Sequence, residues 1–108
     1  MMREKRANKR FVITAKCYDK RGRLLSTGKN SYKKTHPIQS HFAKMVDLPE
    51  KIYLHAEIDA LLKAGDKKVH KIVVERFDYC GNPANAEPCP VCKAAIKSWG
   101  VGYVEYTT

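Results

Sequence analysis

The sequence lacks any long hydrophobic run. No stretch of its 108 residues approaches the roughly 20 consecutive apolar residues that a membrane-spanning helix needs. The first ten residues, Met1–Arg10, are highly charged, and no apolar run of the kind found in signal peptides follows them. Internal repeats and low-complexity linkers are also absent. We therefore expect a cytoplasmic protein without a membrane anchor.

Acidic residues are scarce relative to basic ones. Twenty-one Lys and Arg against eleven Asp and Glu give a formal net charge of +10. This excess favours a polyanionic or phosphate-bearing partner, such as single-stranded nucleic acid, and a basic surface that only aids solubility is the alternative. Residues 1–10 contain a single acid, Glu4, beside five cations: Arg3, Lys5, Arg6, Lys9 and Arg10. We interpret 1–10 as a basic N-terminal arm and 11–108 as one domain, because the chain is too short for two cores.

The pattern of the remaining sequence predicts an α/β fold. Residues 11–18 and 23–30 are rich in β-formers and flank the turn sequence Asp19-Lys20-Arg21-Gly22, which predicts a hairpin. Helical spacing of apolar residues predicts helices over 37–47, 55–65 and 89–100. Strands are expected over 71–79 and 101–108, the first of them central in the sheet because it begins with a continuous apolar run. The later strand-helix-strand units imply a mixed sheet covered by helices.

Cysteine is also infrequent, and two of the four cysteines occur together in Pro88-Cys89-Pro90-Val91-Cys92. A Cys-x-x-Cys motif by itself is compatible with a redox pair or with half of a zinc finger. About thirty residues upstream, however, His55 and Glu57 form a His-x-Glu motif, and both motifs are expected at helix starts. His55, Cys89 and Cys92 then supply three zinc ligands, and Glu57 suits a proton shuttle better than a fourth ligand. The combination indicates a catalytic site with Zn2+ as cofactor.

Other residues that could carry chemistry have ordinary structural interpretations. Cys17 and Cys80 are expected to be buried or half-buried thiols. His36 and His41 are interpreted as a loop and a helix-face histidine, with extra ligands or phosphate contacts as the less favoured alternative. Gly28 is expected to let backbone approach a ligand closely.

The two motifs resemble the zinc-dependent cytidine and deoxycytidylate deaminase superfamily, in particular its small, phage-like CMP/dCMP-type members, from about residue 10 to the C-terminus. The resemblance implies that His55, Cys89 and Cys92 hold the metal and that Glu57 is the general acid and base. It further implies substrate contacts by three residues: Asn30, Ala56 and Pro88. The implied fold is a three-layer α/β/α cytidine deaminase-like domain with a mixed, about five-stranded sheet. Family members usually carry a full helix before the first strand; here only ten residues precede Phe11, so a reduced N-terminal helix and altered subunit contacts in any homo-oligomer are expected.

Three functions are compatible with these observations. The favoured one is hydrolytic deamination of cytosine to uracil in a free nucleotide or nucleoside such as dCMP, CMP or cytidine, with basic residues near Asn30 able to meet a phosphate: Lys29, Lys33 and Lys34. The second is deamination of cytosine, or less readily adenine, within single-stranded DNA or RNA, which the net charge and the basic arm favour. The third is a non-catalytic, zinc-stabilised nucleic-acid-binding module, which would leave Glu57 without a role.

Overall fold

A computed structural model gives the fold of the chain and describes residues 12–31, 33–49, 53–78 and 80–108. Its elements are β1 (Val12–Tyr18), β2 (Leu24–Lys29), α1 (Pro37–Met45), α2 (Ala56–Ala64), β3 (Lys71–Phe77), α3 (Pro90–Ser98) and β4 (Tyr103–Tyr106). Every strand and helix predicted from the residue pattern is present, with ends that shift by a few residues. The basic arm over 1–10 and the reduced N-terminal helix lie outside the described residues.

The strands form one mixed sheet in the order β2-β1-β3-β4. β1 pairs antiparallel with both β2 and β3, whereas β3 and β4 pair in parallel. The parallel pair requires a crossover connection, and α3 supplies it. The α/β class, the mixed sheet and the central position of β3 are therefore confirmed. The sheet has four strands in the described part of the chain, whereas the resemblance implied about five.

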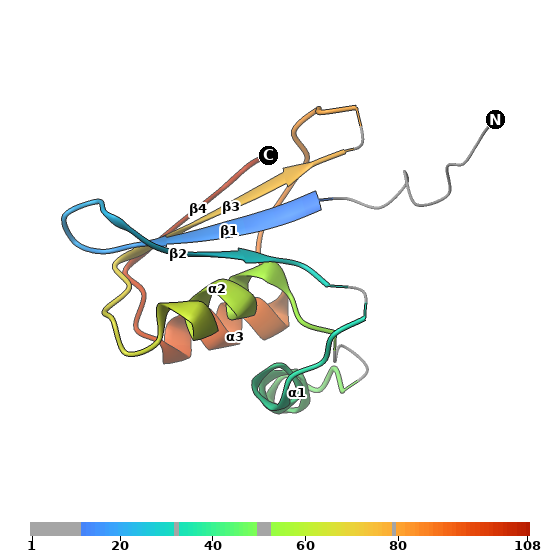
Figure 1. Cartoon of the computed structure of the whole chain (residues 1–108). Helices are drawn as coiled ribbons and strands as arrows, with labels where there is room; N and C mark the ends of the chain where they lie inside the picture. Colours follow the sequence, from blue (N-terminus) through green and yellow to red (C-terminus); the bar gives the residue numbers. More distant parts are fainter. Residues whose placement is uncertain (1–11, 32, 50–52, 79) are drawn as a thin grey trace.

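All three described helices lie on the same side of the sheet (Figure 1). Ala15 of β1 and Val74 of β3 are register partners on that side, and both are buried. On the other side, Lys16 and Glu75 form an ion pair at 3.6 Å and remain more than one-third exposed. The described residues thus form two layers where three were expected, because one sheet face is apolar and the other carries hydrated charges.

The helices are nine residues long each. α1 packs on α3 through Phe42 and Trp99, whose ring centroids are 6.1 Å apart. None of the helices in the described ranges has the length and apolar character that crossing a bilayer requires.

Gly28 sets the distance between β2 and α2. A Cβ atom at this position would overlap the backbone of Ala56 and Ala60, so only glycine lets the strand lie this close to the helix. The hydroxyl of Ser26 fixes the same contact by donating to the carbonyl oxygen of Ala60 at 2.7 Å. Gly28 was expected to let backbone approach a ligand closely, but in this structure the close neighbour is helix α2. The contact positions the first turn of α2.

All four cysteines are free thiols. Cys17 is fully buried on the helix-facing side of the sheet, as expected, and burial raises the pKa of its thiol. Cys80 is exposed, so the expectation for this residue was wrong. It lies in a tight loop in which its own backbone N–H donates to the Asp78 carboxylate at 2.9 Å, and residues 80–83 of this loop are all exposed.

Candidate metal centre and adjoining pocket

The two sequence motifs occur at the starts of neighbouring helices. His55 is the N-cap residue of α2 and Cys89 is the N-cap residue of α3, each with an extended backbone conformation. Neither side chain makes the usual capping hydrogen bond to its own helix. Pro90 follows Cys89 at the first helical position, where a missing N–H costs nothing. The expectation that His55 sits at a helix start is confirmed.

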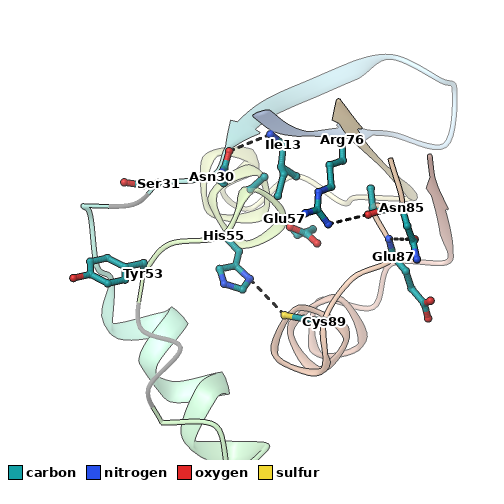
Figure 2. Close-up of a pocket in the computed structure, with 12 residues that line it drawn as sticks. Ile13, Asn30, Ser31, Tyr53, His55, Glu57, Arg76, Asn85, Glu87 and Cys89 are labelled. Carbon is teal, nitrogen blue, oxygen red and sulfur yellow. Dashed lines mark hydrogen bonds between the residues drawn. The ribbon is translucent and has the colours of Figure 1, made fainter. Parts of the chain in front are cut away.

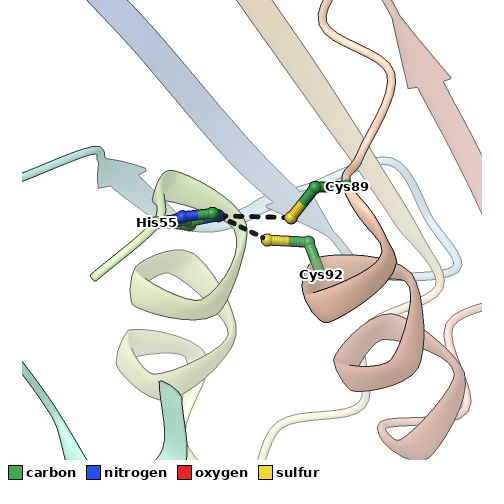
Figure 3. Close-up of side chains that lie close together, drawn as sticks. All are labelled: His55, Cys89 and Cys92. Carbon is green, nitrogen blue, oxygen red and sulfur yellow. Dashed lines mark hydrogen bonds between the residues drawn. The ribbon is translucent and has the colours of Figure 1, made fainter. Parts of the chain in front are cut away.

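The three predicted ligands converge between these helix starts (Figure 3). His55 Nδ1 lies 3.3 Å from Cys92 Sγ and 3.5 Å from Cys89 Sγ. The ligand atoms of the three residues all lie within 4.8 Å of one another. Tetrahedral zinc, with Zn–S near 2.3 Å and Zn–N near 2.0–2.1 Å, would separate nitrogen and sulfur by about 3.6 Å. The donor set and its spacing therefore fit zinc, with three protein ligands and one coordination position for water, as in catalytic zinc sites.

The two thiols of this group have strongly divergent acidities. The hydrogen bond from the Cys92 thiol, followed by those from the His55 ring and the Cys92 backbone N–H, lowers the pKa of Cys89 to about 4 against the opposing effect of burial. The hydrogen bond to Cys89 and the burial of the thiol together raise the pKa of Cys92. One sulfur of the pair is thus anionic at neutral pH, which is the form that binds a cation.

Glu57 is the second residue of α2, in the first turn of the helix, and it is not one of the grouped ligand residues. Glu57 is 6% exposed, and its side chain faces the same cavity as His55 and Cys89 (Figure 2). Burial raises the pKa of this carboxyl group, with the Glu57 backbone N–H and His55 opposing the shift. A buried carboxyl group next to a metal centre is suited to carry protons.

A cavity of about 310 Å³ opens beside the metal centre. This volume lies at the lower end of the range for small-molecule sites, about 300–1,000 Å³. Its walls come from both motifs, from the ends of β1, β2 and β3, and from the loop before α3: Ile13, Asn30, Ser31, Tyr53, His55, Ala56, Glu57, Arg76, Asn85, Ala86, Glu87 and Cys89.

Two of the three predicted substrate-contacting residues line this cavity. Ala56 is one of them, and Asn30 is the other. Asn30 also joins the ends of β1 and β2, because its Oδ1 accepts from the Ile13 N–H at 3.1 Å and its own N–H donates to the Ile13 carbonyl at 3.3 Å. Pro88 is buried and lines a separate groove between α3 and β4. Contacts of these residues with substrate stay predictions.

The two other candidate histidines, His36 and His41, are not part of the metal group. His36 is the N-cap of α1, and its Nδ1 accepts from the Ile38 N–H at 3.0 Å. His41 is exposed on α1 and packs edge-on against Phe42 with centroids 5.0 Å apart. Both have the ordinary structural roles that were expected.

Several residues of the site were not predicted, and three of them have a contact or an exposure that bears on its chemistry. Gln39 of α1 is fully buried, and its Oε1 accepts from the backbone N–H of His55 at 3.1 Å. Tyr53 is 48% exposed at the edge of the cavity. Arg76 lines the opposite wall, where its Nη1 donates to the Asn85 carbonyl at 3.2 Å. Arg76 could have been found, because period-two alternation in β3 places it on the same face as buried Val74.

Comparison with known proteins supports the interpretation of this site as a zinc centre. The family model described as the cytidine and deoxycytidylate deaminase zinc-binding region matches residues 1–108. No curated protein and no solved structure was found to match the chain. The family match and the convergence of His55, Cys89 and Cys92 together establish Zn2+ as the cofactor. The chain therefore belongs to the cytidine and deoxycytidylate deaminase zinc-binding family.

Proposed function

We propose that this protein hydrolyses the amino group of cytosine in a free nucleotide or nucleoside, such as dCMP, CMP or cytidine, so that the corresponding uracil nucleotide or nucleoside and ammonia are formed. One observation carries the proposal: the ligand residues His55 and Cys89 and the buried carboxyl group of Glu57 share one cavity of about 310 Å³. A metal centre that only stabilised the fold would have no need of a buried acid on its open side.

The chain's own residues have separate roles in this reaction. When bound, zinc supplies Lewis-acid activation of the water that attacks ring carbon C4. Glu57 takes one proton from this water and passes it to ring N3, and then carries the second proton, from the hydroxyl now on C4, to the departing amino group. Asn30 and Ala56 line the cavity on the side of β2 and α2, where they orient the sugar and the ring. The site excludes bulk water around Glu57, which is 6% exposed.

Deamination of cytosine within single-stranded DNA or RNA is the second candidate. Tyr53 favours it, because this residue is 48% exposed at the edge of the cavity and its aromatic ring offers a stacking surface for a neighbouring base. The net charge of +10 favours it as well. A non-catalytic zinc module is disfavoured, since it gives Glu57 no role.

The experiment that tests the proposal offers dCMP, CMP, deoxycytidine and a cytosine-containing DNA oligonucleotide to the purified zinc protein side by side. Uracil formation is followed by chromatography. Turnover of the monomeric substrates is expected. Turnover of the oligonucleotide alone would make the second candidate the function, and lack of turnover of all four would reject cytosine deamination.

A further inference from the structure

A second pocket of about 630 Å³ adjoins the cavity beside the metal centre. The two share Asn30 and Ser31 in their walls, so the second pocket lies against the side of the cavity that these two residues form. The residues that line the second pocket come from the end of β2, the following loop and α2: Thr27, Lys29, Asn30, Ser31, Lys34, Leu54, Asp59 and Lys63. We call it the lysine pocket.

The lysine pocket carries an excess of positive charge. Its only acid, Asp59, accepts from the Lys63 ammonium at 3.0 Å and from the backbone N–H of Lys29 at 3.0 Å. Within the described ranges, the ammonium groups of Lys29 and Lys34 have no ion-pair partner. Three lysines and one aspartate leave two uncompensated positive charges. A phosphate monoester carries about −1.5 to −2 charges at neutral pH, which matches this excess.

Backbone hydrogen bonds hold Lys34 in place next to the catalytic cavity. Its N–H donates to the Ser31 hydroxyl oxygen at 2.8 Å, and its carbonyl accepts from the Leu54 N–H at 2.9 Å. Leu54 in turn accepts from the Ser31 N–H at 2.9 Å and directly precedes His55. The loop that carries Lys34 is thus tied to the residue before the first metal ligand. A phosphate bound here would be held at a fixed position relative to the ring in the cavity.

We propose that the lysine pocket binds the phosphate monoester of the substrate and makes the enzyme prefer a nucleoside monophosphate to a nucleoside. This inference rests on the proposed function, because it assumes that a cytosine nucleoside occupies the adjoining cavity. The structure also distinguishes which of the lysines near Asn30 can contact a phosphate, which the sequence could not do. Lys29 and Lys34 line the pocket, whereas their neighbour Lys33 does not. Lys63 joins them from α2, more than thirty positions along the chain from Lys29.

The test compares the binding of dCMP and of deoxycytidine to the zinc-loaded Glu57→Gln protein by titration calorimetry. With the wild-type lysine pocket, dCMP should bind at least about tenfold more tightly than deoxycytidine, because charge-assisted hydrogen bonds are the strong ones. Lys34→Glu should reduce this ratio about tenfold. Lys33→Glu is the matched control: it makes the same charge change one residue away and should leave the ratio unaltered. Equal ratios in all three proteins, or equal losses in both lysine variants, would overturn the proposal.

Two further measurements separate this proposal from its alternatives. A DNA oligonucleotide without a terminal phosphate is titrated into the same proteins; if Lys34→Glu weakened binding of the oligonucleotide and not of dCMP, the pocket would serve a phosphodiester and the monoester assignment would be wrong. Turnover of dCMP and of deoxycytidine by the protein with Glu57 intact tests the proposed function on its own. If uracil formed from neither compound, deamination would be rejected, and the dCMP-to-deoxycytidine binding ratio would still decide whether the lysine pocket binds phosphate.

Discussion

The side-chain carbonyl oxygen of Gln39 accepts a hydrogen bond from the backbone N–H of His55 at 3.1 Å. Gln39 is fully buried on α1. This helix contributes no metal ligand of its own, but through Gln39 it fixes the backbone of the ligand residue His55. Replacing a residue that orients a metal ligand typically lowers metal affinity by about 10- to 100-fold. Gln39 is accordingly a positioning residue for the metal centre.

Replacement of this acceptor should weaken the metal centre. Gln39→Met keeps the volume of the side chain but leaves the His55 N–H without this partner, at a cost of about 1–3 kcal/mol in unfolding free energy. Zinc affinity should fall about tenfold in a competition titration with a chromogenic chelator. Lys44→Met, an exposed position on the same helix, serves as the control. Unchanged zinc affinity in Gln39→Met would mean that the hydrogen bond does not position His55.

Glu57→Gln should keep zinc and lose turnover. The amide preserves the shape of the side chain but cannot carry the proton, so kcat should fall by a factor of about 10² to 10⁴. Zinc content by atomic absorption should stay near one per chain. Glu87→Gln is the control, because Glu87 lines the same cavity with its carboxylate held by Lys93 at 2.8 Å. A Glu57→Gln protein that had lost both zinc and activity would instead make Glu57 a metal ligand.

Cys89→Ala should lose the metal and with it part of the stability of the fold. Because binding of zinc to the folded chain contributes to folding free energy, wild-type protein treated with a chelator should melt at a lower temperature. The Cys89→Ala protein should already melt low and respond little to the chelator. Cys80→Ala, which removes an exposed thiol, should behave as wild type. Retained stoichiometric zinc in Cys89→Ala would contradict the ligand assignment.

The ligands could be predicted from the sequence because metal chemistry restricts both residue type and spacing. Histidine at one helix start and two cysteines at another leave few geometries open, and the structure brings His55, Cys89 and Cys92 together as expected. The positions of the strands and helices could also be predicted, because the spacing of apolar residues along the chain indicates each element locally. The fifth strand and the third layer came only from the resemblance, and the described residues do not contain them.

Features that depend on tertiary contacts could not be predicted. In the sequence, Gln39 is an ordinary polar residue of a helix. Its hydrogen bond to His55 depends on how α1 packs against the segment before α2. The lysine pocket joins Lys34 in a loop to Lys63 on a helix, and nothing in their spacing signals the pairing. Cys80 was misjudged because exposure of a loop residue depends on how Asp78 folds the turn around it.

Gly28→Ala should be strongly destabilising. The added Cβ would lie 2.9 Å from the Cα of Ala60 and still closer to two backbone atoms of α2, which cannot rotate away as a side chain could. Overpacking of this kind costs about 1–3 kcal/mol and occasionally more, so a loss of at least about 3 kcal/mol in urea unfolding is expected. Gly102→Ala is the control, since its Cβ would meet its nearest neighbour, the His70 carbonyl, at 3.4 Å. Similar losses in both variants would mean that β2 and α2 can separate at little cost.

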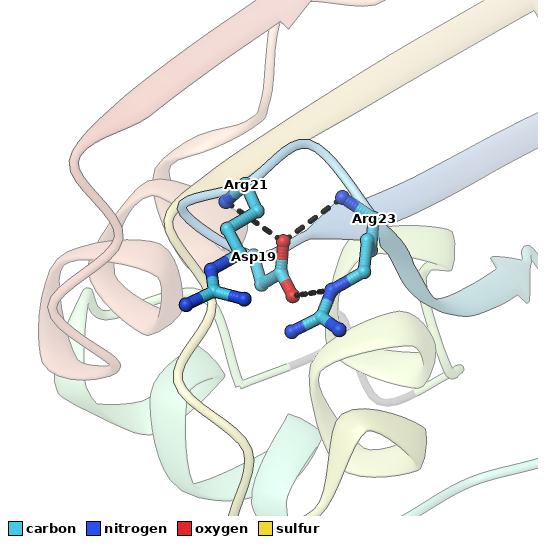
Figure 4. A network of polar contacts seen from close by, with 3 residues as sticks. All are labelled: Asp19, Arg21 and Arg23. Carbon is cyan, nitrogen blue, oxygen red and sulfur yellow. Dashed lines mark hydrogen bonds and ion pairs between the residues drawn. The ribbon is translucent and has the colours of Figure 1, made fainter.

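The hairpin between β1 and β2 should make a pH-dependent contribution to stability through Asp19. Its Oδ1 accepts from the backbone N–H groups of Arg21 and Arg23 at 2.9 Å each, and its Oδ2 accepts from the Arg23 Nε at 2.8 Å (Figure 4). The Arg23 backbone N–H is the main cause that lowers the pKa of Asp19, with the Arg23 side chain and the Arg21 N–H adding to it.

A lowered pKa in the folded state means that the ionised carboxylate stabilises the fold above its unfolded pKa of about 3.9. This stabilisation is lost as the pH falls through the folded value. Asp19→Asn should therefore melt below wild type at pH 7, and the gap in melting temperature should close as the pH is lowered below about 4. Asp66→Asn, which removes the same charge from an exposed loop position, corrects for the change in net charge. A gap between Asp19→Asn and wild type that stayed constant from pH 7 to pH 2.5 would show that the carboxylate's charge adds nothing to the turn, and that only its shape as a hydrogen-bond acceptor matters.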